Sequence, residues 1–231
     1  MPTKENRSSD NHRIRDGMKH LILCEGRDEW NFLVSYLNSK ALEERSEYSG
    51  TIQVEDFGGN EELPTKLMLW VRAPGFENLK SLIVIRDAES SAETASNCVI
   101  RAFEKAGLPV PTSPHHFVSD EKIKTGFLLF PECSSELRDG TLEDLCLSIL
   151  EENDDAVLNE VETFLSDLES RCVLSFPRRF KAKLHTYFSI EDKYVSLKIG
   201  EAAKAGAFNW YSSNLNQIKS FLSEMIQQGI S

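Results

Sequence analysis

The sequence predicts an α/β fold, with a mostly parallel four-stranded sheet flanked by helices and a C-terminal all-helical extension. Two observations support this fold class. Apolar runs of strand length alternate with segments of helical periodicity as far as Gly140, and only helical periodicity follows. The runs at residues 21–24 and 82–85 are continuously apolar, which is typical of parallel strands buried on both faces.

The individual elements follow from these patterns and from their boundary residues. Ser90 and Ser91 offer an N-cap for one helix, Gly107 closes it, and Thr141 is a good cap for another. The expected strands cover residues 21–24, 51–57, 79–86 and 126–131. The expected helices cover residues 29–42, 61–72, 91–105, 142–151, 155–171, 180–189, 199–205 and 215–227.

The expected organisation has three parts. Residues 1–19 are polar and predict a mobile tail, because they lack the apolar core of a secretion signal. The α/β core then covers residues 20–150, and the helical extension over residues 151–231 packs on it. No apolar run approaches the roughly 18–20 residues of a membrane span. The five scattered cysteines lack CxxC spacing, so we expect no disulfide framework and a cytoplasmic protein.

The charge of the chain restricts its partners. The net charge of −11 argues against a protein that coats nucleic acid by bulk electrostatics, although metal-dependent nuclease sites are themselves acidic. The charge is also uneven, with an acidic sector over residues 132–169 and a basic one over residues 171–204. This pattern is consistent with a metal site beside a phosphate-binding surface, or with two solvated helical faces.

Acidic residues follow three of the expected strands, and they are the candidate site. Carboxylates at the ends of neighbouring parallel strands can lie close enough to hold Mg²⁺ or Mn²⁺, which prefer oxygen ligands. A single acidic pair after a strand is usually a cap or a solvated turn, but three in this order favour a metal site. The candidate metal ligands are Glu25 and Asp28, Asp87 and Glu89, and Glu143 and Asp144.

Such a site points to phosphodiester hydrolysis. Two bound ions would orient and activate water and stabilise the leaving oxygen. A nearby lysine, Lys181 or Lys183, would stabilise charge on the phosphate.

The order of these motifs resembles the Toprim domain of topoisomerases, primases and the overcoming-lysogenisation-defect (OLD) nucleases. The resemblance rests on an apolar strand with Glu25-Gly26, a strand with Gly58-Gly59, and an apolar strand with Asp87-x-Glu89. It implies a Toprim/Rossmann-like fold in which Glu25 is a general acid/base and metal ligand, and Asp87 and Glu89 bind divalent metal. Glu89 departs from the usual Asp, and Asp28 and Glu29 compete for a further acidic position.

The chain is more similar still to small stand-alone Toprim-like proteins of unknown function related to the OLD group. The shared motifs are Glu25-Gly26-x-Asp28, Pro131 with Gly140-x-Leu-Glu143-Asp144, Lys181-x-Lys183-x-His185, and Gly200-x-x-Ala203. This resemblance implies a nuclease in which Glu143 and Asp144 complete a second metal site and Lys183 supports the phosphate.

Two other functions stay open from the sequence. One is a non-catalytic or partner-dependent module that holds metal or phosphate within a complex; an ATPase subunit would have to be a separate protein, because the chain has no G-x-x-x-x-G-K-[ST] motif. The other is a phosphoacceptor domain, which also gathers acids around magnesium, with Asp87 as the acceptor.

Overall fold

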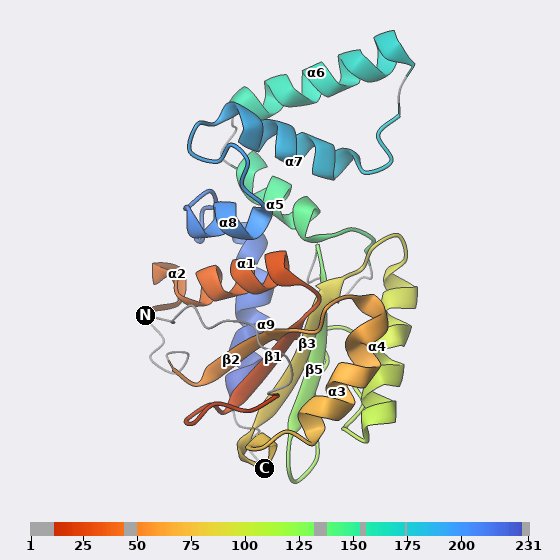
Figure 1. Cartoon of the computed structure of the whole chain (residues 1–231), viewed down its shortest axis with the longest axis vertical. Coiled ribbons are helices and arrows are strands. Elements are labelled where there is room, and N and C mark those ends of the chain that lie inside the picture. Colours follow the sequence, from red (N-terminus) through yellow and green to blue (C-terminus); the bar gives the residue numbers. More distant parts are fainter. Residues whose placement is uncertain (1–11, 44–49, 132–137, 153–155, 174, 228–231) are drawn as a thin grey trace.

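The computed structural model describes residues 12–43, 50–131, 138–152, 156–173 and 175–227. Its centre is a five-stranded sheet with the order β2-β1-β3-β5-β4 (Figure 1). Four strands are parallel, and β4 pairs with β5 in the antiparallel direction. The strands are β1 (His20–Cys24), β2 (Ile52–Asp56), β3 (Ser81–Asp87), β4 (Val118–Ser119) and β5 (Lys124–Phe130).

The predicted α/β class with flanking helices is confirmed, and the predicted count of four strands is wrong. The extra strand, β4, has only two residues and therefore shows no alternation that a sequence pattern could reveal. Among the described residues no strand follows β5, so the C-terminal part is helical as expected.

The helices begin and end close to the expected positions. Ser91 accepts a hydrogen bond from the Thr94 amide at the start of α4, and Gly107 ends that helix with a left-handed φ of 69°. The expected helix over residues 29–42 is divided into α1 and α2. The helices are α1 (Arg27–Leu37), α2 (Lys40–Glu43), α3 (Leu63–Val71), α4 (Ala92–Ala106), α5 (Leu142–Glu151), α6 (Ala156–Cys172), α7 (Arg179–Ile190), α8 (Ile199–Lys204) and α9 (Asn216–Ile226), with 3₁₀ turns η1 (Asn60–Glu62), η2 (Phe76–Asn78) and η3 (Ser213–Leu215).

Both faces of the sheet are buried, each by its own set of helices. Alternate strand residues such as Leu21 and Val84 pack with α3 and α4. The intervening residues, such as Ile22 and Ile85, pack with α1, α5, α8 and α9 on the other face. This three-layer arrangement is visible in Figure 1, where α3 and α4 lie on one side of the strands. It explains why the central strands are continuously apolar.

The strand order fixes where a ligand can reach the sheet. The chain leaves β1 for β2 on one side and returns to β3 on the other side of β1. In open α/β sheets, the carboxyl ends of the strands at such a reversal form a crevice. Here the crevice lies at the ends of β1 and β3, where Glu25 and Asp87 are placed.

Part of the expected mobile tail packs on the body of the protein. Residues 1–11 lie outside the described residues, whereas Ile14 is buried and its amide donates to the Pro74 carbonyl. The Gln53 side chain accepts from the Arg15 amide and donates to the Arg13 carbonyl, which holds this segment beside β2.

Helices α6 and α7 form a hairpin at one end of the molecule, and α5 lies between this hairpin and the sheet (Figure 1). No helix in the described part of the chain is long and apolar enough to cross a membrane.

Candidate functional site

A cleft of about 870 Å³ opens at the carboxyl ends of β1 and β3. It lies between the first turns of α1 and α5, so two helix N-termini, where partial positive charge gathers, border it. The start of α7 forms part of its mouth. All six acidic residues predicted as metal ligands line this cleft, namely Glu25, Asp28, Asp87, Glu89, Glu143 and Asp144.

Asp87 lies at the floor of the cleft and is the most buried of these carboxylates. Asp87 is only 8% exposed. Its Oδ1 atom accepts a hydrogen bond of 2.9 Å from the Leu142 amide at the start of α5. Burial, together with the charges of Glu29, Glu143 and Glu25, raises the pKa of Asp87 to about 9. In the metal-free protein the Asp87 carboxyl group is therefore protonated at neutral pH, and a bound cation would favour its ionised form.

Glu25 follows β1 directly and faces a buried arginine. Its Oε2 atom is buried and has no hydrogen-bond partner among the described residues, while the Arg86 Nε atom lies 3.6 Å away. Burial raises the pKa of Glu25, although the Arg86 charge opposes this shift. Arg86 also donates to the Asp87 carbonyl, so this 4%-exposed cation fixes the end of β3 as well.

Glu29 is the acidic residue of α1 that contributes to the cluster. Burial and the charges of Glu25, Asp28 and Glu143 raise the pKa of Glu29 to about 7. A Cβ atom on Gly26 would lie 3.0 Å from the Glu29 carboxylate, so glycine at this position leaves room for it.

Two predicted ligands instead cap helices. The Asp28 Oδ1 atom accepts a hydrogen bond of 3.1 Å from the Gly200 amide at the start of α8. Asp144 closes the capping box of α5, where its Oδ2 accepts from both the amide and the hydroxyl of Thr141. The carboxyl groups that raise the pKa of Asp87 or are raised with it form a cluster of Glu25, Glu29, Asp87 and Glu143, whereas Asp28 lines the same cleft but is bound to α8.

Glu89 lies at the outer edge of the cleft. Its backbone has a left-handed φ of 56° and forms a two-way bridge with Gly140, with both N–H···O distances at 2.8 Å. This bridge joins the end of β3 to the loop that precedes α5. Gly140 itself has no room for a side chain, because a Cβ atom would lie 2.8 Å from Pro131.

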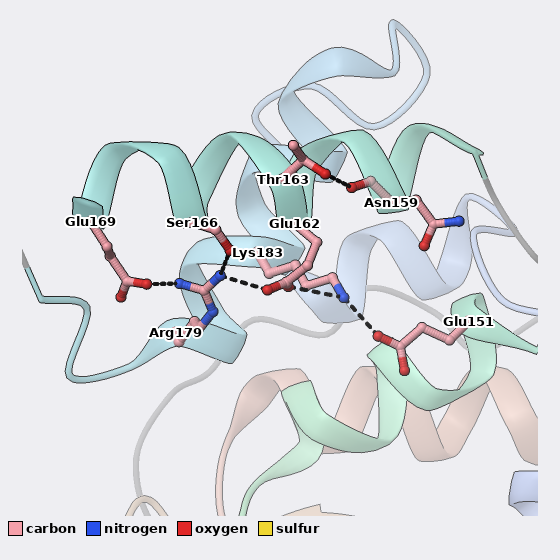
Figure 2. Close-up of polar contacts among 8 residues, drawn as sticks. All are labelled: Glu151, Asn159, Glu162, Thr163, Ser166, Glu169, Arg179 and Lys183. Carbon is pink, nitrogen blue, oxygen red and sulfur yellow. Dashed lines mark hydrogen bonds and ion pairs between the residues drawn. The ribbon is translucent and has the colours of Figure 1, made fainter. Parts of the chain in front are cut away.

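Of the two candidate lysines, the structure brings Lys181 to the cleft and leaves Lys183 outside it. The Lys181 ammonium lies 3.3 Å from Glu143 Oε1. Lys183 is buried and pairs with Glu151 at 2.7 Å and Glu162 at 3.3 Å (Figure 2). Residues 181 and 183 are two apart and cannot share a helix face.

The acidic and basic sectors of the sequence partly neutralise each other. Arg179 of α7 binds Glu162, Ser166 and Glu169 of α6, and Figure 2 shows it between these side chains. These contacts use part of the basic sector to join α7 to α6, while Arg178 and Lys181 of the same sector line the cleft.

The family of the chain is shown by a match over most of its length. The family model described as "Protein of unknown function (DUF3226)" matches residues 19–227. The chain belongs to this family. No curated protein and no solved structure matches the chain. The match includes the sheet, the cleft and the helices from α1 to α9, so the DUF3226 region carries the whole candidate site.

The side chains that line this DUF3226 cleft have the oxygen donors that a divalent metal ion prefers. In the described residues they do not converge on a common point. The donors are carboxylates, and Glu25 Oε2 is a buried acceptor without a donor, which suits a hard cation. Within the described ranges, however, no group of three or more His, Cys, Asp or Glu side chains is positioned to hold a metal ion.

Proposed function

We propose that this DUF3226 protein is a metal-dependent phosphodiesterase of the Toprim type that cleaves nucleic acid. The observation that carries the proposal is the cluster of Glu25, Glu29, Asp87 and Glu143 in one cleft at the reversal point of the sheet. Four carboxyl groups gathered in one cleft have little structural use, because their repulsion and burial, which raise the pKa of Glu29 and Asp87, destabilise the fold. A bound divalent cation would offset both.

The proposed ligands of Mg²⁺ or Mn²⁺ are Asp87 and Glu89 after β3, Glu25 after β1, and Glu143 at the start of α5. Glu29 supports this set in place of Asp28, and Asp144 remains a cap. The side chains would have to turn toward a common point when the ion binds. When bound, the ion would supply Lewis-acid charge that stabilises the phosphate and the leaving oxygen.

The protein residues have separate roles in this proposal. The Glu25 carboxylate would take a proton from the attacking water, and Arg86, whose Nε atom lies 3.6 Å from the buried Oε2 atom, would hold that carboxylate in place. Lys181, half-exposed at the mouth, would meet a phosphate oxygen in place of Lys183. The N-termini of α1 and α5 would add favourable partial charge for the phosphate.

Incubation with supercoiled plasmid and with structured RNA tests this proposal. In Mn²⁺ or Mg²⁺ we expect cleavage by the full chain, and we expect its loss in EDTA and in the Glu25→Gln variant. The matched control is Glu104→Gln, an exposed glutamate on α4 outside the cleft, which should cleave like the wild type. Cleavage that survives in Glu25→Gln would overturn the role of Glu25.

A partner-dependent binding module is the second candidate. The observation that favours it is that the described carboxylates are not yet positioned as a metal group, which a partner protein would have to complete. Absence of cleavage by the chain alone, with cleavage restored by a partner ATPase, would select this alternative.

A further inference from the structure

One exposed aromatic side chain lies at the mouth of the acidic cleft. Among the described residues seven large apolar side chains are exposed, and only Phe180 of these lines the cleft. Single exposed apolar side chains are common on protein surfaces. Phe180 differs because it is 56% exposed at the entrance to a cleft that contains the candidate catalytic groups.

Three basic side chains line the same cleft as Phe180. Arg178 and Lys181 are close to Phe180 in the sequence at the start of α7, and Arg27, which also stacks on Trp30, begins α1; all three are exposed. Lys181 and Arg27 each lie near one carboxylate, Glu143 and Asp56 respectively. Cationic side chains and an exposed aromatic side chain in one cleft are the combination that single-stranded nucleic-acid sites use.

The start of α7, and with it the backbone of Phe180, is anchored to α6. The preceding residue, Arg179, points away from the cleft and joins α7 to Glu162, Ser166 and Glu169 of α6 (Figure 2). An aromatic side chain on an anchored backbone has only its two side-chain torsions to order when a base binds, which limits the loss of conformational entropy.

Size and charge favour an unpaired strand over a duplex. The cleft volume of about 870 Å³ lies within the roughly 300–1,000 Å³ that is usual for small-ligand pockets. It can admit an unstacked nucleotide but not a double helix. The net charge of −11 also gives little non-specific attraction for a duplex, so binding must come from local contacts.

We propose that the mouth of the cleft is a base-stacking subsite for a single-stranded polynucleotide. Phe180 stacks on an unpaired base, while Arg178, Lys181 and Arg27 contact the flanking phosphates and direct one of them toward the carboxylates. The inference rests on the proposed function, because it names the substrate class of the same cleft.

Fluorescence anisotropy of labelled oligonucleotides of about 12 nucleotides tests the subsite. The full chain is titrated in EDTA at low salt, with single-stranded DNA, single-stranded RNA and the matching DNA duplex as separate arms. We expect tighter binding of a single strand than of the duplex. Comparison of single-stranded DNA with single-stranded RNA shows whether the subsite prefers deoxyribose or ribose.

The variants then test Phe180 itself. Phe180→Ala should weaken single-strand binding at least about fivefold, since one stacked base contributes on the order of 1–3 kcal/mol. Phe180→Trp should retain binding, and Phe164→Ala should leave it unchanged. Phe164 is a matched control because it is 51% exposed on the neighbouring α6 but does not line the cleft.

Equal binding by wild type and Phe180→Ala, absence of binding, or preference for the duplex would each overturn the inference. Because the titration contains no metal and measures no cleavage, its outcome is separate from that of the nuclease assay. If the wild type cleaves nucleic acid and Phe180→Ala binds the single strand as tightly as the wild type, only the stacking subsite is wrong. If Phe180→Ala weakens binding but the wild type cleaves nothing in Mg²⁺ or Mn²⁺, only the proposed nuclease activity is wrong.

Discussion

Asp87 is an unfavourable residue for the stability of the metal-free fold. Its carboxylate is buried, and three neighbouring carboxylates further raise its pKa to about 9. Ionisation of this group is therefore costly in the folded state and inexpensive in the unfolded chain, where the pKa is near 3.8. A residue that weakens the fold and lies in a cleft is a candidate for function.

Asp87→Asn should stabilise the metal-free protein. Asparagine keeps an oxygen to accept the hydrogen bond from the Leu142 amide but carries no charge. Because the folded-state pKa of Asp87 is raised, the cost of ionisation appears as the pH rises above about 4 and increases toward pH 9.

Urea unfolding in EDTA measures this effect. We expect the variant to gain on the order of 1–2 kcal/mol at pH 8, and a smaller amount at pH 5. A variant that is less stable than the wild type at pH 8 would contradict this account of the cluster.

The contact between α1 and α8 shows why some acidic residues serve structure. Gly200 lies against α1, where an added Cβ atom would be 2.5 Å from the Asn31 Cβ atom. This close approach brings the Gly200 amide to Asp28, which is thereby used as a cap for α8. The Gly200-x-x-Ala203 motif is therefore explained by helix packing, since Ala203 is also buried there.

Gly200→Ala tests this packing. In an exposed helix the change from glycine to alanine stabilises by about 1 kcal/mol. Here we expect a loss of roughly 1–3 kcal/mol, because the backbone of α8 must move away from α1. The shift of the urea midpoint measures it, and a stabilised variant would mean that α8 does not lie this close to α1.

The sequence predicted the elements well where their signals are local. The continuous apolar runs located β1, β3 and β5, and capping residues such as Ser91 and Thr141 located helix starts. Strand β4 could not be predicted, because its two residues pair only through the tertiary fold. The division between α1 and α2 is likewise absent from the apolar pattern.

The site was predicted only in part, because sequence does not show which carboxylate a distant segment uses. The α1–α8 contact assigns Asp28 to a cap, and the capping box assigns Asp144 to α5. Helical spacing left both Lys181 and Lys183 as candidates, and the packing of α7 on α6 places Lys181 in the cleft and Lys183 outside it. Arg86 was missed, although an arginine at the end of an apolar strand was a detectable signal.

At the scale of the whole molecule, the acidic residues gather at the end of the sheet where the strand order leaves a crevice. The sheet order puts the ends of β1 and β3 at the reversal point, and α1, α5 and α7 form the walls of the cleft. The cluster of Glu25, Glu29, Asp87 and Glu143 is thus exposed to ligands on one side and supported by the core on the other. The central claim is that this cluster binds a divalent cation.

Calorimetric titration of Mn²⁺ into the metal-free full chain tests that claim most directly. We expect saturable binding by the wild type, a higher unfolding temperature at saturation, and loss of both effects in Asp87→Asn. The Glu104→Gln variant should bind like the wild type. Absence of binding, or binding that is unchanged in Asp87→Asn, would contradict the assignment of this cleft as a metal site.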